Sequence, residues 1–154
     1  MFLVENIMSR NVVSVTPSSS LETVSKKMTQ QNISCVIVKQ GHTLLGIISE
    51  RDFVKKVVSR GKNTAGLTAS SVMSTPLISV SSRESILRAA KKMRVHKLRH
   101  LAVVDDGALL GIVTETDMMR GESDCLKSHQ LLQNLVLTIF LTILLLFVVV
   151  FRLI

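Results

Sequence analysis

The sequence of 154 residues contains no tryptophan and no tyrosine. Aromatic rings are the platforms on which proteins stack single-stranded nucleic acids, so the sequence disfavours this kind of binding. Only two cysteines are present, without a CxxC pair, and the four histidines show no metal-ligand spacing. These absences give no indication of a metal or redox site, and we expect that no metal is bound.

Recognisable catalytic patterns are missing as well. The sequence shows no Ser/His/Asp order, no metal cluster and no phosphate-binding loop, so we expect that the protein is not an enzyme and requires no cofactor. The 19 lysines and arginines outnumber the 11 aspartates and glutamates, which gives a net charge of +8. A basic surface leaves nucleic acid binding as an alternative. Because no recognition-helix or zinc pattern supports it, we expect no nucleic acid partner.

The charge-free stretch LVLTIFLTILLLFVVVF runs from Leu135 to Phe151. A helix begun at Leu131 would be about 31 Å long, enough to cross a bilayer core. The apolar residues cover every face of that helix, whereas a coiled coil would show a single seam. The sequence therefore predicts a transmembrane helix over residues 131–154, preceded by a juxtamembrane segment over residues 122–130.

The distribution of basic residues predicts the orientation of this span. All lysines and arginines except Arg152 precede it, which favours a cytoplasmic location for the folded part. Glu5 and Arg10 interrupt the first residues before an apolar core forms, so we expect no signal peptide. We therefore predict a single-pass, tail-anchored membrane protein with an unidentified membrane protein partner.

The stretch GIISERD at residues 46–52 returns as GIVTETD at residues 111–117. With a constant shift of 65, residues 7–52 overlay residues 72–117 without a gap, and 15 of the 46 aligned positions are identical. An ungapped repeat of this length indicates two copies of one folding unit. A unit of this size is close to the lower limit for burying its own core. We therefore expect the copies to pack on each other as an intramolecular pseudo-twofold pair.

Each copy shows the same succession of patterns. A short β-branched run is followed by apolar residues at helical spacing, then by two strands joined by a turn, and then by a second helix. The expected strands cover residues 11–15, 35–38 and 44–49 in the first copy, and 77–80, 101–104 and 109–114 in the second. Ser19 with Glu22, and Ser81 with Glu84, have the capping-box spacing of a helix start. The order is β-α-β-β-α in both copies.

The expected fold class is therefore α/β, more specifically α+β, with tandem β-α-β-β-α units. The first unit covers residues 1–58 and the second covers residues 72–121. The stretch between them, residues 59–71, is small and polar, as is typical of a linker.

The double GhhSxxD and GhhTxxD pattern, the element order and the "hMS" stretch before the first strand resemble the cystathionine-β-synthase (CBS) domain pair, or Bateman module. The resemblance covers residues 4–121. It implies a non-catalytic sensor that binds adenosine-containing ligands, such as AMP, ADP, ATP or S-adenosylmethionine, in the cleft between the copies. It also implies a homodimer.

The GhhSxxD pattern supplies candidate ligands for a ribose. The two oxygens of a carboxylate suit the two vicinal hydroxyls of the sugar, which makes Asp52 and Asp117 candidates. Ser49 and Thr114 lie three residues earlier, where a hydroxyl can reach the ribose or a phosphate. The same spacing is that of a capping box, so all four residues also fit a purely structural role at a helix start. The sequence leaves both roles open.

The resemblance also assigns phosphate contacts to Arg99 and His100. The first copy has Ser34 and Cys35 at the corresponding positions, so we expect the site with Thr114 and Asp117 to bind a phosphorylated ligand more tightly. The alternative is a solvated basic strand edge that limits sheet pairing.

Phe2 and Phe53 are the only aromatic residues before the apolar tail, so we expect aliphatic walls to hold the base. Among the apolar residues at motif positions we select Ile37 and Ala102, and we expect strand-end backbone near Thr16 and Ser81 to contact the adenine edge. The alternative for the apolar residues is an ordinary core position.

Together these features predict a membrane-anchored sensor module that binds an adenine nucleotide or S-adenosylmethionine. The alternative is a ligand-free dimerisation scaffold for a membrane partner.

Overall fold

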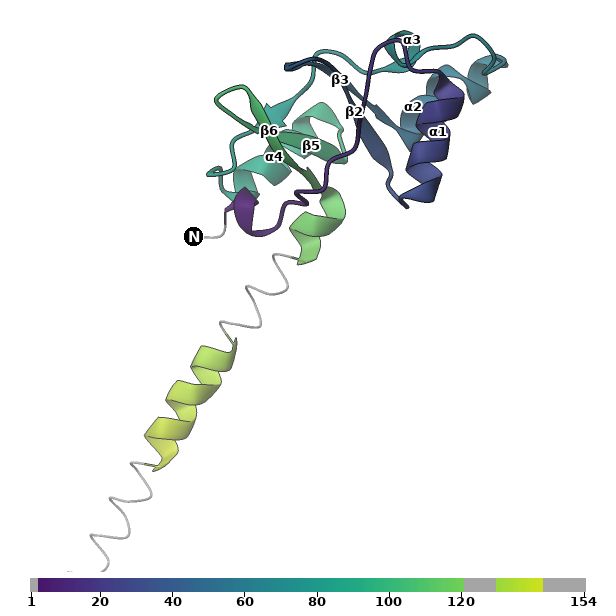
Figure 1. The fold of residues 1–154 in the computed structure, drawn as a ribbon. Helices are drawn as coiled ribbons and strands as arrows, with labels where there is room; N and C mark the ends of the chain where they lie inside the picture. Colours follow the sequence, from purple (N-terminus) through teal and green to yellow (C-terminus); the bar gives the residue numbers. More distant parts are fainter. Residues whose placement is uncertain (1–2, 121–129, 143–154) are drawn as a thin grey trace, which may run out of the picture.

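The computed structural model describes residues 3–120 and 130–142 (Figure 1). The first half contains η1 (Val4–Asn6), β1 (Ser14–Val15), α1 (Leu21–Gln30), β2 (Cys35–Gln40), β3 (Thr43–Ser49), α2 (Glu50–Lys56) and η2 (Val58–Arg60). The second half contains α3 (Ala69–Val72), β4 (Ser79–Val80), α4 (Ile86–His96), β5 (His100–Asp105), β6 (Ala108–Thr114) and helical residues 115–120. A further helix covers residues 130–142.

Each half has a three-stranded mixed sheet, with the orders β1-β2-β3 and β4-β5-β6. The first strand is parallel to the second, and the second and third form an antiparallel hairpin. The two registers are equivalent, since Ser14 pairs with Ile37 and Ser79 pairs with Ala102 at a shift of 65. The predicted β-α-β-β-α order and the α+β class are confirmed.

The first helix of each half covers one face of its sheet, because its apolar residues recur at helical spacing. Leu21, Val24 and Met28 of α1 are buried, as are the equivalent Ile86, Ala89 and Met93 of α4. A separate apolar cluster joins residues of both sheets: Cys35, Ile37, Ala102 and Ile112. The two halves therefore share a core, as the predicted intramolecular pair requires.

The predicted capping residues of these helices are wrong. Ser20 caps α1 by accepting a hydrogen bond from the Thr23 amide, and Ser85 caps α4 in the same way from Arg88. Ser19 and Ser81 instead belong to the turns that precede the helices, in which the Ser19 amide donates to Thr16 and the Glu84 amide to Ser81. Because of these turns, the helices begin after the predicted positions, with Ser20 and Ser85 as the capping residues.

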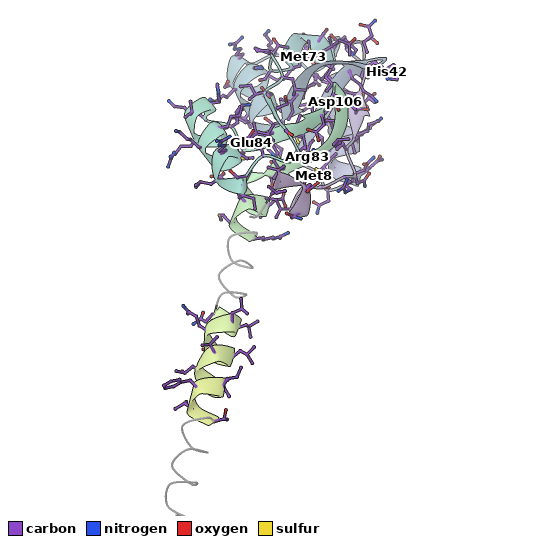
Figure 2. All side chains as sticks on the ribbon, turned by 90° about the vertical axis from the view of Figure 1, so that its left-hand side faces the viewer. Met8, His42, Met73, Arg83, Glu84 and Asp106 are labelled. Atoms are coloured by element: carbon purple, nitrogen blue, oxygen red, sulfur yellow. The ribbon has the colours of Figure 1, made fainter. Side chains whose placement is uncertain are left out.

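The segment in front of each half crosses to the other half. The amide and carbonyl of Ser9 pair with those of Ile112 in β6, at 2.8 and 2.9 Å. Ser74 pairs in the same way with Ile47 in β3, at 2.8 and 3.2 Å. We call residues 4–9 and 69–74 the arms. Figure 2 shows their equivalent methionines, Met73 near the top and Met8 in the lower half of the folded part. Through the arms, each half completes the other's structure.

Two strand glycines make the arm contacts possible. A Cβ on Gly46 would lie 2.6 Å from the Ser74 carbonyl oxygen, and one on Gly111 would lie 2.7 Å from the Ser9 carbonyl oxygen. Real Cβ atoms do not approach backbone oxygens this closely. The repeated glycine therefore serves the close approach of another backbone.

The structure corrects the predicted membrane anchor. Within residues 3–120 and 130–142, no helix is long and apolar enough to cross a membrane. Most of residues 122–130, and residues 143–154, lie outside the described residues. The predicted tail-anchored location was wrong.

We predict that Gly111→Ala lowers the free energy of unfolding by about 1–3 kcal/mol, because the new methyl group forces the arm away from β6. Urea unfolding followed by circular dichroism measures this change. Gly41→Asn is the control, since no atom lies within 4 Å of that site and asparagine tolerates its positive φ of 58°. A Gly111→Ala variant as stable as this control would contradict the close arm contact.

Candidate functional site

A cleft of about 430 Å³ lies between the two halves. Its first-half wall includes Ser34 and the turn from β3 into α2, together with Ser74 of the second arm. Its second-half wall includes residues 97–100 and the turn from β6 into the last helical segment, residues 114–116. The volume falls within the usual range for small-molecule sites.

Basic side chains from both halves face this cleft: Arg51, Lys55, Lys56, Lys97 and Arg99. The acidic residues along it are Glu50, Asp52 and Glu115, so its formal charge is positive. Arg99 forms a long ion pair with Glu115, with 3.6 Å between Nε and Oε2, and its side chain is 68% exposed. The Arg51 guanidinium donates to the carbonyl of Lys97 at 3.0 Å, which joins the halves across the cleft.

His100 forms a second link between the halves. Its Nε2 lies 2.8 Å from the hydroxyl of Ser34. Burial lowers the pKa of His100, and the nearby Arg99 and Arg51 lower it further, while the charges of Glu50 and Asp117 act in the opposite direction. His100 is therefore neutral at pH 7 and offers a hydrogen bond rather than a positive charge.

Asp52 is buried and fully paired. Its Oδ2 accepts hydrogen bonds from the amide and hydroxyl of Ser49, at 2.8 and 2.7 Å. Its Oδ1 accepts from the Ser74 hydroxyl at 2.6 Å and pairs with the Lys56 ammonium at 2.8 Å. Burial acts to raise the pKa of Asp52, but the hydrogen bonds from Lys56, Ser74 and Ser49 outweigh it and lower the pKa.

Asp117 is half-buried and only partly paired. Its Oδ2 accepts hydrogen bonds from the amide and hydroxyl of Thr114, at 2.9 and 2.7 Å, and the Asp117 amide donates back to that hydroxyl at 3.1 Å. This is a capping box, as the structural alternative predicted. Among the described residues, no hydrogen bond or ion pair involves its Oδ1.

Half of the predicted site residues come together along the cleft. Ser49, Asp52, Arg99, His100 and Thr114 line it. Asp117 is not among the lining residues, but it is bonded to Thr114 and its charge acts on His100. It therefore lies at the edge of the cleft.

The structure places the other four predicted residues elsewhere. Ile37 and Ala102 have no exposed surface, because they pack between the two sheets. Thr16 bonds with the hydroxyls of Ser18 and Ser19 in the turn before α1, and Ser81 accepts from the Arg83 amide. None of these four residues lines the cleft.

Sequence reasoning missed several residues of the cleft, notably Lys56 and Ser74. Lys56 lies four residues after Asp52, which is the spacing of a helical ion pair and was a usable signal. Ser74 lies 22 residues from Asp52 in the sequence, and no local sequence pattern predicts their contact.

A protein-family model of the CBS domain matches residues 4–59 and again residues 69–124. The chain belongs to the CBS domain family. The CBS domain-containing protein YhcV of Bacillus subtilis is 31% identical over 116 residues, which is 75% of this chain and 81% of YhcV. The chain spans 59% and 48% of two longer relatives, from Methanopyrus kandleri and Arabidopsis thaliana. The match therefore covers only part of those proteins.

Solved structures share the fold of this CBS pair. A CBS-domain containing protein from Agrobacterium tumefaciens has a TM-score of 0.73 and is 25% identical, covering 78% of this chain and 92% of its own. The structure of CBSX2 in complex with AMP has a TM-score of 0.68 and is 24% identical, covering 81% of this chain and 98% of its own. These matches confirm the tandem arrangement of the two CBS units.

We predict that Asp52→Ala lowers the free energy of unfolding by about 2–4 kcal/mol, because a buried ion pair and three hydrogen bonds are lost together. Asp117→Ala is the matched substitution in the second unit and removes only a capping box, so we expect a loss of about 1 kcal/mol. Chemical unfolding at pH 7 measures both. Equal losses would contradict the difference between the two carboxylates.

The hydrogen bonds and the ion pair of Asp52 also make the stability of the fold depend on pH. Because the pKa of Asp52 is lowered from its ordinary value of 3.8, its ionised form stabilises the fold above pH 3.8, and this stabilisation is lost as the pH falls through the folded-state pKa. The stability difference between the wild type and Asp52→Asn should therefore shrink below pH 3.8.

Proposed function

We propose that this CBS pair is a regulatory module that binds an adenosine-containing ligand at the cleft between its halves. The candidates are AMP, ADP, ATP and S-adenosylmethionine. The module is not an enzyme and requires no cofactor. A ligand that contacts both halves stabilises one relative orientation of the units, and a partner protein responds to that orientation.

The observation that carries this proposal is the meeting of cationic side chains from both halves in one cleft. Lys97 and Arg99 come from the second half and Arg51 from the first. Guanidinium groups form strong, charge-assisted hydrogen bonds with phosphate oxygens. Arg99 is largely exposed and weakly paired, so it is free to turn from Glu115 to a phosphate.

Asp117 supplies the second contact, to the sugar. Thr114 holds one of its oxygens, and the other is available to accept a hydrogen bond from a ribose hydroxyl. Neutral His100 adds a hydrogen-bonding group to the same part of the cleft. Phosphate and diol recognition thus occur side by side, as a nucleotide requires.

Family membership supports the proposal at the level of the fold. CBSX2, which shares the fold, was solved in complex with AMP, so this architecture accommodates an adenine nucleotide. Which adenosine ligand this chain binds depends on its own cleft residues.

The alternative function is a ligand-free dimerisation scaffold. Large apolar side chains are exposed on the outer helices: Val54, Val58, Leu87 and Val95. Two equivalent grooves follow these helices, one beside α1 and α2 and one beside α4 and residues 115–120. A second copy of the chain would cover this surface, and we propose a homodimer whether or not a nucleotide is bound.

We predict that the full chain binds AMP or ATP in calorimetric titration, and that Arg99→Gln weakens this binding about 10–100-fold. The loss of one charge-assisted hydrogen bond, about 1.5–3 kcal/mol, corresponds to this factor. S-Adenosylmethionine has no phosphate, so its binding should change little.

Arg83→Gln is the control, because it makes the same charge change at an exposed residue outside the cleft. Equal weakening by both variants would indicate non-specific charge attraction. If the wild type binds neither AMP, ATP nor S-adenosylmethionine, the sensor function is rejected and the ligand-free dimerisation scaffold is the remaining proposal.

A further inference from the structure

The two units carry different residues at the position four residues after the repeated carboxylate. Lys56 ends α2, and its ammonium contacts four acceptors: the carbonyls of Val72 and Met73, the Ser74 hydroxyl and Oδ1 of Asp52. The distances are 2.8, 3.1, 2.9 and 2.8 Å. An ammonium has three N–H donors, so these acceptors saturate Lys56. Lys56 and Ser74 together occupy Oδ1 of Asp52, and the amide and hydroxyl of Ser49 occupy Oδ2. Neither oxygen of Asp52 is left for a ligand.

The repeat places Gly121 at the position equivalent to Lys56. Glycine has no side chain, so this position provides no cation for Asp117. The arm of the first unit differs as well. Ser9, the counterpart of Ser74, forms backbone pairs with Ile112, but no hydrogen bond joins it to Asp117 within the described part of the chain.

We propose that Lys56 closes the first of two pseudo-equivalent ligand sites, so that the chain binds one nucleotide, beside Asp117. This inference rests on the proposed function of the cleft. Lys56 and Ser74 supply Asp52 with the two donors that the hydroxyls of a ribose would otherwise supply. The first unit thus carries its own substitute for a ligand.

Displacing Lys56 is unfavourable for two physical reasons. A neutral diol would replace a charge-assisted contact to a buried carboxylate with weaker hydrogen bonds, leaving Asp52 without its counter-ion. Lys56 also fastens the second arm to α2 through the carbonyls of Val72 and Met73. A ligand at Asp52 would have to break this fastening as well.

The test is the number of AMP molecules bound per chain, measured by equilibrium dialysis of radiolabelled AMP. We expect one for the wild type and two for Lys56→Met, which keeps the length of the side chain but removes its charge and donors. Lys56→Gln is a second, milder variant if Lys56→Met folds poorly, as judged by circular dichroism. In the double variant Lys56→Met with Asp52→Asn, the number of AMP molecules bound per chain should return to one.

Lys26→Met is the matched control. Lys26 also forms an ion pair at i,i+4 spacing, with Glu22 at 2.7 Å, but this pair is exposed and lies outside the cleft. Its replacement should leave the count at one.

Each outcome decides the proposal. Two AMP molecules per wild-type chain, or no gain in either Lys56 variant, would overturn it. A gain that survives Asp52→Asn would overturn it too, because the new site would not be at Asp52. If the wild type binds none and a Lys56 variant binds one, Lys56 is the closing residue, while the proposed function at Asp117 fails.

Discussion

The exchange of arms between the two halves is the constraint on which the rest of the structure depends. The backbone of Ser9 pairs with Ile112, and that of Ser74 pairs with Ile47, each against a glycine that leaves room for the carbonyl. The arms bury Val4 and Met8 against the second half, and Ala69 against the first. Neither unit completes its core alone, because part of that core is delivered by the segment in front of the other unit.

The same exchange builds the cleft and makes it asymmetric. The second arm brings Ser74 to Asp52, and Lys56 joins them, so the first carboxylate is satisfied within the protein. In the second unit the capping box of Thr114 and Asp117 occupies only one oxygen of the carboxylate. A nearly symmetric backbone therefore carries two chemically different sites. Two features make the difference: Lys56 has a glycine as its counterpart in the repeat, and Ser74 donates to Asp52 whereas its counterpart Ser9 forms no hydrogen bond with Asp117 among the described residues.

Local and repeated patterns made most of the fold predictable. The 65-residue shift identified the two units, and the β-branched runs located β2, β3, β5 and β6 to within two residues. The capping-box alternative for Ser49 and Thr114 was correct because it depends only on residues three apart. The apolar run after Leu131 predicted a membrane-spanning helix, and no such helix is present within residues 3–120 and 130–142.

Contacts between distant segments were not predictable. Lys56 and Ser74 meet at Asp52 only because the second arm folds back onto the first unit, and no local spacing encodes that return. Ile37 and Ala102 were expected to hold a base, but the sheets pack on each other and bury both. The sequence motif identified the two candidate carboxylates. Only the folded structure shows that Asp117, unlike Asp52, has an oxygen without a hydrogen bond among the described residues.

A crystal structure of the chain grown with AMP tests the central claim most directly, because it locates the ligand relative to both carboxylates. The account predicts one nucleotide whose ribose contacts Asp117 and whose phosphate contacts Arg99, with the Lys56 ammonium still on Asp52. A nucleotide bound at Asp52, with Lys56 displaced, would contradict it.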